Sequence, residues 1–321
     1  MSRPAGASNI AHRNKSRPQL KKLVGSICAL ATPFRGDALD LDAFARLIDY
    51  QLAGGTQALV VAGSTGEAHA LEQAEFERLL AFAVEHVGRR VPVLAGTGTA
   101  NTRKTIKATQ LARNLGADAA LVVTPYYVRP TQEGLRQHYL AIAEQGGLPV
   151  VLYNVPSRTG CDLLPETVAK LAGHERIVGI KEARGDTERV AALVALKNPH
   201  FSVLSGDDPT CARAMLAGAQ GVISVAANVA PAALRTICDA ALDGNSAQTR
   251  FADEALADLY TLLGVEPNPI PVKWCLHELG LGAAEPRLPL LPLSIAHHAH
   301  GRSILDALRL SAVQPRHSSA A

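Results

Sequence analysis

A repeated alternation of two kinds of segment constrains the fold of this chain more than any other feature. Short, nearly continuous apolar runs recur after residue 24, and longer amphipathic stretches separate them. Runs that are apolar on both faces are typical of parallel strands covered by helices. Eight such runs are present, at residues 25–31, 58–62, 91–95, 119–123, 150–154, 177–181, 202–205 and 221–225.

The stretches between the runs have the spacing of amphipathic helices. In residues 42–52 the apolar positions fall on one helical face, and residues 73–86 show the same pattern. Residues 102–115 follow Asn101, a good N-cap, and precede Gly116, a good helix terminator. Eight strand–helix units predict an α/β fold, a (β/α)8 TIM barrel. The pattern alone also fits a doubly wound sheet, although a Gly-x-Gly-x-x-Gly motif after the first strand is absent.

The chain divides into three predicted regions. Residues 1–22 carry six Lys or Arg residues and no acid, which predicts a disordered basic tail; without an apolar core they are not a secretory signal. Residues 23–246 are predicted to form the catalytic barrel. Residues 247–321 resume helical patterning and are expected to form a C-terminal helical appendage.

Composition excludes several classes of function. The net charge is only +3 and charged residues make up 19% of the chain, so neither nucleic acid nor a membrane surface is an expected partner. No apolar run approaches the roughly 20 residues that span a bilayer. The five cysteines are widely spread without a CxxC pair, which argues against disulfides and structural zinc and fits the reducing cytoplasm. Asp207 and Asp208 lack an evident third ligand, so no metal site is expected.

Chemistry in a barrel of this kind belongs at the carboxyl ends of the strands. Lys181 directly follows a buried apolar run, where desolvation disfavours the ammonium form, and a neutral amine is the nucleophile that attacks a ketone. On this segment alone, a lysine that extends from the barrel mouth to water is the favoured interpretation.

Other strand ends carry groups that could act with this lysine. Tyr153 could pass a proton over the mouth, and Arg158 could hold a carboxylate with two parallel hydrogen bonds. Ser64 and Thr65 lie in a Gly-rich turn whose amides could cradle an anion. We expect Glu67, in the same turn, to complement a helix N-terminus. Each of these segments also fits an ordinary core residue or loop.

Taken together, the strand-end segments resemble the dihydrodipicolinate synthase family, within the N-acetylneuraminate lyase superfamily. The similarity extends over nearly the whole chain after residue 22. The matching segments are Thr32-Pro33-Phe34, 63–67, Ala95-Gly96-Thr97-Gly98, 124–127, 153–160, 179–183, 205–208 and 221–225. Their order and spacing together are specific.

The resemblance implies a reaction. Lys181 would form an imine with pyruvate, whose enamine would add to L-aspartate 4-semialdehyde to give 4-hydroxy-tetrahydrodipicolinate. It also implies a homotetramer, a dimer of dimers, with no metal or organic cofactor. The remaining roles that it implies are a proton relay of Tyr153, Ser64 and Tyr127, with Tyr127 lent across a subunit interface; a pyruvate carboxylate site at Thr65; a semialdehyde carboxylate site at Arg158; and backbone lining of the pyruvate pocket by Gly206 and Ile223.

The sequence departs from the family pattern in two places. Ser64 stands where the family often has threonine, so the relay hydroxyl is kept without the methyl group that fixes its rotamer. In lysine-inhibited relatives polar side chains hold the effector, but here Ala100 and Lys104 stand at two of those positions. Because Lys104 would repel a cationic effector, we expect weak or absent inhibition by L-lysine.

Three other functions stay open. The chain could be another pyruvate-dependent class I aldolase, acting on N-acetylneuraminate or a 2-keto-3-deoxy sugar acid, and Lys181 cannot discriminate among these. A non-catalytic keto-acid sensor would need no proton relay. A phosphosugar enzyme would need a Gly-rich anion loop after the last strands, and residues 225–228 fit this poorly.

Overall fold

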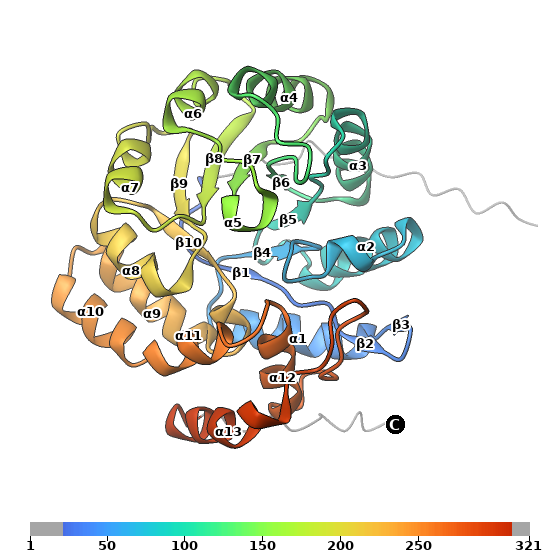
Figure 1. Ribbon diagram of the computed structural model, residues 1–321, viewed down its shortest axis with the longest axis vertical. Helices are drawn as coiled ribbons and strands as arrows, with labels where there is room; N and C mark the ends of the chain where they lie inside the picture. The colour runs from blue at the N-terminus through green and yellow to red at the C-terminus, as the bar shows by residue number, and fades with distance from the viewer. Residues whose placement is uncertain (1–21, 310–321) are drawn as a thin grey trace, which may run out of the picture.

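A closed barrel of eight parallel strands forms the centre of the protein (Figure 1). The computed structural model describes residues 22–309. The strand order is β1-β10-β9-β8-β7-β6-β5-β4, and β4 pairs back with β1. The strands are β1 (Gly25–Ala29), β4 (Ala58–Val61), β5 (Val93–Gly96), β6 (Ala119–Val123), β7 (Val150–Asn154), β8 (Ile177–Glu182), β9 (Ser202–Ser205) and β10 (Gly221–Ser224). All eight predicted strands are confirmed, and closure of the sheet rules out a doubly wound arrangement.

Helices surround the barrel as the sequence predicted. This ring consists of α1 (Leu41–Ala53), α2 (Gln73–Val87), α3 (Thr102–Leu115), α4 (Gln132–Gln145), α6 (Pro165–Leu171), α7 (Thr187–Val194), α8 (Asp208–Leu216) and α9 (Pro231–Leu242). Asn101 caps α3 by accepting a hydrogen bond from the Lys104 amide, and Gly116 ends it with a φ of 106°. A two-stranded hairpin of β2 (Phe34–Arg35) and β3 (Ala38–Leu39) was not predicted.

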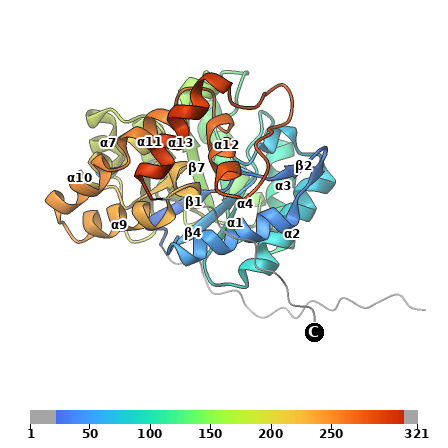
Figure 2. The same ribbon diagram turned by 90° about the horizontal axis from the view of Figure 1, so that it is seen from below.

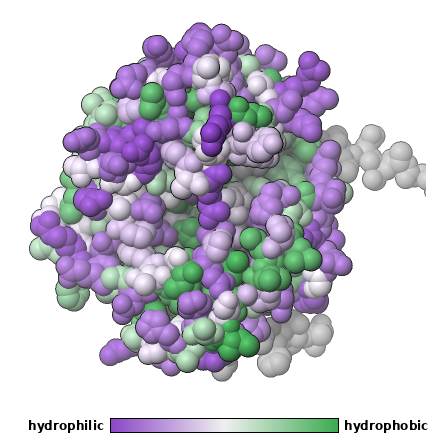
Figure 3. All heavy atoms as spheres, in the orientation of Figure 1, coloured by the Kyte–Doolittle hydropathy of each residue, from purple (hydrophilic) through white to green (hydrophobic). Residues whose placement is uncertain are grey.

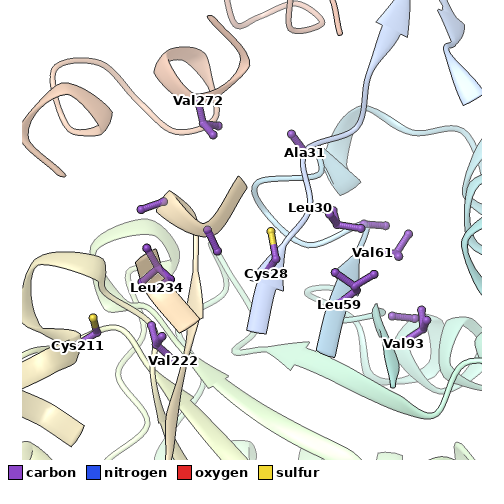
Figure 4. Close-up of a cluster of buried hydrophobic side chains, with 14 of the residues drawn as sticks. Cys28, Leu30, Ala31, Leu59, Val61, Val93, Cys211, Val222, Leu234 and Val272 are labelled. Atoms are coloured by element: carbon purple, nitrogen blue, oxygen red, sulfur yellow. The ribbon is translucent and has the colours of Figure 1, made fainter. Parts of the chain in front are cut away.

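Two apolar layers hold this architecture together. The inner layer fills the barrel with side chains from alternate strand positions, among them Ile27, Val60, Leu94, Leu204 and Ile223. The outer layer lies between the strands and the helices. Figure 4 shows part of it, where strand residues such as Leu59 and Val222 meet residues of the surrounding segments. Alternate residues of each strand face the barrel interior and the surrounding helices, and both of these sides are apolar. This is why the runs in the sequence are almost continuously apolar.

The C-terminal region adds helices to one side of the barrel (Figures 1 and 2). They are α10 (Ser246–Glu254), α11 (Ala257–Leu263), α12 (Ile270–Glu278) and α13 (His298–Ala307). The helical appendage is thus present, with α10 and α11 packed against the last barrel helices. The predicted tail at residues 1–22 lies, apart from Lys22, outside the described residues, as do residues 310–321. Between residues 22 and 309, no helix combines the length and the apolar composition needed to cross a bilayer.

Candidate active site

Lys181 and Tyr153 lie side by side inside the barrel. They occupy neighbouring strands, β8 and β7, as directly paired residues. Lys181 is only 3% exposed and its Nζ lies 4.5 Å from the centre of the Tyr153 ring. The alternative interpretation of Lys181, as a side chain that extends into water, is therefore wrong. Tyr153 is also buried, so the two side chains lie together in the interior of the protein.

The residues that follow these two in each strand point away from them into a buried polar network. Asn154 donates to both carboxylate oxygens of Glu182 at 3.1 Å and to Asp162 at 2.8 Å. Arg189 pairs with Glu182 at 3.0 Å and with Asp162 at 2.6 Å. Burial raises the pKa of Glu182 against the opposing charge of Arg189. For Asp162, burial is outweighed by hydrogen bonds from Asn154 and Arg189, which hold its pKa below the usual value. The network fixes the ends of β7 and β8 relative to each other.

The turn after β4 places Ser64 and Thr65 beside the barrel mouth. Thr65 is 1% exposed, and its Oγ1 accepts a hydrogen bond from Asn268 Nδ2 at 3.0 Å. Ser64 is partly exposed. The Gly66 carbonyl accepts a hydrogen bond from Thr32 at 2.7 Å, which ties the turn to the end of β1. The turn thus presents one buried and one partly exposed hydroxyl.

Glu67 does not have the role that we predicted from the sequence. Its backbone is left-handed, with a φ of 51°, and its side chain makes no helix-capping hydrogen bond. Instead Glu67 is fully buried and binds Lys273 of α12 at 2.5 Å. It also accepts a hydrogen bond from the Arg287 amide at 2.8 Å. The carboxylate therefore connects the turn to the C-terminal region, which supplies both of its donors.

Gly206 and Ile223 lie at the ends of β9 and β10. A Cβ atom on Gly206 would lie 2.8 Å from Lys181 Cγ and 2.9 Å from its Cε. Any residue larger than glycine would therefore displace the Lys181 side chain from its observed position. Ile223 is fully buried in the inner layer. Nearby, burial raises the pKa of Asp208, while its hydrogen bonds and the positive charge of Lys181 oppose the rise.

Two predicted site residues lie at the surface. Arg158 is exposed in α5 (Pro156–Thr159), and its Nη2 donates to the main-chain oxygen of Asn268 at 3.3 Å. Figure 1 shows α5 in front of the strands, so their carboxyl ends face the viewer, and Figure 3 shows the same face hollowed near its centre. Tyr127 is 92% exposed, with a φ of 72°. Among residues 22–309 of the same chain, none accepts a hydrogen bond from the Tyr127 hydroxyl.

Sequence reasoning missed Asn268 and Lys273. The run Pro267-Asn268-Pro269-Ile270-Pro271 was a signal, since so rigid a segment just before a helix suits a fixed contact. A single lysine in the apolar first turns of α12 was another, because a buried lysine needs an acidic partner. Both residues join the C-terminal region to the turn after β4.

The arrangement provides the parts of an imine-forming site. A buried amine lies beside a phenol, and Asn268 contacts both a threonine hydroxyl and an exposed guanidinium. Such a set can form a covalent bond to a keto acid and bind a second carboxylate. Across residues 22–309, no group of three or more His, Cys, Asp or Glu side chains could hold a metal ion.

Comparison with known proteins agrees with this geometry. The model of the dihydrodipicolinate synthetase family matches residues 22–308. A curated 4-hydroxy-tetrahydrodipicolinate synthase from Xanthomonas axonopodis pv. citri (strain 306) is 60% identical over 93% of this chain and 99% of its own length. The chain belongs to the dihydrodipicolinate synthetase family. This family lies within the N-acetylneuraminate lyase superfamily, so the resemblance drawn from the strand-end motifs is confirmed.

Solved structures of the same family have the same fold. A chloride-inhibited dihydrodipicolinate synthase from Acinetobacter baumannii, complexed with pyruvate, superposes with a TM-score of 0.87 at 44% identity, over 89% of this chain and 99% of that one. The enzyme from Cyanidioschyzon merolae with lysine bound has a TM-score of 0.87 at 34% identity, over 90% of this chain and 100% of that one. The expected insensitivity of this chain to L-lysine stays a prediction.

Proposed function

We propose that this chain is a 4-hydroxy-tetrahydrodipicolinate synthase, a lyase of the class I aldolase type. It condenses pyruvate with L-aspartate 4-semialdehyde in lysine and diaminopimelate biosynthesis. The observation that carries the proposal is the buried Lys181 amine, 4.5 Å from the Tyr153 ring, in a chain 60% identical to a curated synthase. The enzyme is expected to work in the cytoplasm.

The reaction starts at Lys181. Its neutral amine attacks the keto carbon of pyruvate, and the carbinolamine oxygen takes up a proton and leaves as water, giving an imine. Loss of a proton from the pyruvate methyl group gives an enamine, which attacks the aldehyde carbon of the semialdehyde. The amino group of the semialdehyde then attacks the imine carbon, closing the ring and releasing the Lys181 amine. The burial of Lys181 next to the Tyr153 phenol supports this sequence, since it encloses the amine beside a group that can transfer protons.

The protons of these steps pass through hydroxyl groups. Tyr153 is the nearest, and Ser64 and Tyr127 complete the proposed relay. Thr65 and the neighbouring amides bind the pyruvate carboxylate, while Gly206 and Ile223 line the pocket. Arg158 binds the carboxylate of the semialdehyde. Neither a metal nor an organic cofactor takes part, because the imine itself withdraws the electrons.

A second copy of the chain completes the relay. Tyr127 lies at the surface, 92% exposed, so it is free to enter the site of a neighbouring protomer. Its amide donates to the Thr159 carbonyl at 3.2 Å, which ties this loop to the segment that carries Arg158. We therefore propose a homotetramer built as a dimer of dimers, with Tyr127 contributed across an interface.

Another pyruvate-dependent aldolase activity is the main alternative. The Gly63–Glu67 turn, with serine at position 64, also fits enzymes that cleave N-acetylneuraminate or 2-keto-3-deoxy sugar acids. Arg158 favours the synthase, because a small carboxylated aldehyde pairs with a guanidinium while a polyol needs hydroxyl partners. Higher kcat/KM with aspartate semialdehyde than with sugar acids would decide for the synthase.

Reductive trapping tests the covalent step. Borohydride added with pyruvate should attach the three-carbon unit to Lys181, and peptide mass mapping should place it there. Lys181→Ala should abolish trapping, whereas Lys170→Ala, an exposed lysine of α6, should leave it unchanged. A label on another side chain, or no label in the wild-type enzyme, would overturn the proposal.

A further inference from the structure

We infer that Asn268 is a positioning residue for pyruvate capture, acting through the Thr65 hydroxyl. This inference rests on the proposed function, because it assigns the group that Thr65 binds. Asn268 lies in the C-terminal region, between α11 and α12, and not at a strand end. Its side chain nevertheless reaches the turn after β4, 203 residues earlier in the chain.

The direction of one hydrogen bond determines which part of the Thr65 hydroxyl is free. Asn268 Nδ2 donates to Thr65 Oγ1 at 3.0 Å, so the threonine oxygen is the acceptor. The Thr65 proton therefore remains available, and no other side-chain hydrogen bond of Thr65 occurs in the described part of the chain. A carboxylate can only accept hydrogen bonds. Asn268 thus occupies an acceptor site of the hydroxyl and leaves its proton to be donated to the pyruvate carboxylate.

The position of Asn268 is fixed by its surroundings. Prolines on both sides restrict its backbone, and the Ile270 amide closes a turn onto the Pro267 carbonyl at 2.9 Å. The α12 helix that follows is buried along most of its length. Lys273 of that helix binds Glu67, two residues from Thr65, at 2.5 Å. The side chain therefore approaches Thr65 from a rigid support, which precise orientation of a binding group requires.

Asn268 also contacts the second substrate site, but with a different atom. Its main-chain oxygen accepts the hydrogen bond from Arg158 Nη2 at 3.3 Å. Any substitution of the side chain leaves that oxygen in place. The two substrates should therefore respond differently, with pyruvate depending on the side chain of Asn268 and the semialdehyde only on its backbone.

Substitution of the side chain tests this separation. Asn268→Ala should raise the pyruvate concentration that half-saturates borohydride trapping by about tenfold, as expected for one hydrogen bond that orients a partner of a charged group. The KM for the semialdehyde should change by less than about twofold, since the main-chain contact survives. Equal changes for both substrates, or no change for pyruvate, would overturn the inference.

Two further variants test whether the effect passes through Thr65. Adding Asn268→Ala to Thr65→Val should cause no further loss of pyruvate affinity, because the hydroxyl to be oriented is already gone. Additive losses would show that Asn268 acts by another route and would contradict the inference. Asn268→Asp, which can only accept, should weaken pyruvate capture more than Asn268→Ala; an equal or smaller loss would also contradict it.

A control separates orientation from stability. Asn245→Ala removes a helix-capping side chain at the start of α10, also in the C-terminal region, and should lower the melting temperature without changing pyruvate half-saturation. A pyruvate shift in this control would mean that general loosening explains the Asn268 effect. Absence of any trapping at Lys181 in the wild-type enzyme would refute the proposed function, whereas normal trapping that does not respond to Asn268 would refute only this inference.

Discussion

Arg158 is the exposed residue to which the proposed function assigns the choice of the second substrate. It lies at the rim of the site on the short helix α5, held by one hydrogen bond from Nη2 to Asn268. That contact leaves most of its five donors free for a ligand. By contrast, Lys181 and Tyr153, to which we assign the step that pyruvate aldolases share, are buried. The proposed mechanism therefore places specificity at the rim and covalent chemistry in the interior.

Replacing Arg158 should separate the two substrates. Arg158→Ala is expected to lower kcat/KM for the semialdehyde by about 10- to 100-fold, the loss of a hydrogen bond to a charged group, with little change in pyruvate trapping. Arg158→Lys should fall between the wild type and the alanine variant, because it keeps the charge and loses the planar fork. Steady-state kinetics with each substrate varied would check this. Equal losses for the two substrates would contradict the assigned role.

His138 should make stability depend on pH. It is buried in α4, and its Nδ1 forms a 2.9 Å hydrogen bond with Thr102 of α3. Burial lowers the pKa of His138 to about 4 from an ordinary 6.5. Because the unfolded chain binds this proton first, stability should fall as the pH drops from 6.5 to 4, by roughly 3 kcal/mol at 1.36 kcal/mol per pH unit.

Urea unfolding across this pH range would measure the effect of His138. His138→Gln keeps a hydrogen-bonding side chain without a titrating ring, so its stability should change less between pH 6.5 and 4. A variant whose stability followed the wild-type pH dependence would show that other groups cause the fall.

Helix α12 is the element that joins the C-terminal region to the catalytic barrel. Its Lys273 is 1% exposed and pairs with the fully buried Glu67. Lys273 Nζ also lies 4.3 Å from the centre of the Phe34 ring, in the small hairpin after β1. Burial lowers the pKa of Lys273, against the opposing charge of Glu67. The helix therefore fixes the turn that carries Ser64 and Thr65.

Breaking this pair should destabilise the protein strongly. Lys273→Met leaves the Glu67 carboxylate buried without its cation, so we expect a loss of about 3 kcal/mol in the free energy of unfolding. Glu67→Gln should cost a similar amount, and combining the two should cost less than the sum of both. Urea unfolding of the three variants would check this. Strict additivity would show that the two side chains stabilise the fold independently.

At the scale of the whole molecule, the described chain leaves one part of its proposed site facing outward. Tyr127 points to solvent while Lys181 and Tyr153 are enclosed. Apolar side chains such as Leu288 and Ile295 are also exposed. Figure 3 shows hydrophobic patches on the face of the molecule at which the strands have their carboxyl ends. If Tyr127 acts in a neighbouring protomer, neither protomer alone has a complete relay.

Mixing two inactive variants should restore activity. Lys181→Ala lacks the nucleophile and Tyr127→Phe lacks the lent hydroxyl, so each should be nearly inactive alone. After subunit exchange, mixed assemblies contain sites with both groups intact, up to about a quarter of all sites for random pairing in twofold dimers. Turnover of the mixture would be compared with the sum of the separate variants. No increase, despite exchange shown by mass spectrometry, would contradict the lending of Tyr127.

The sequence by itself determined the eight strands and the residues at their ends, but not that the sheet closes on itself. Eight apolar runs buried on both faces indicate a covered parallel sheet, but that pattern fits a barrel and a doubly wound sheet alike. The pairing of β4 with β1, a tertiary contact, decided for the closed barrel. The positions of Lys181, Tyr153 and Arg158 could be predicted because strand ends in such a fold converge on one face. The tertiary structure decided the partners of these residues. Glu67 binds Lys273, and Thr65 binds Asn268, because α12 folds back over the turn after β4, and contacts separated by more than 200 residues leave no periodic signal in the chain.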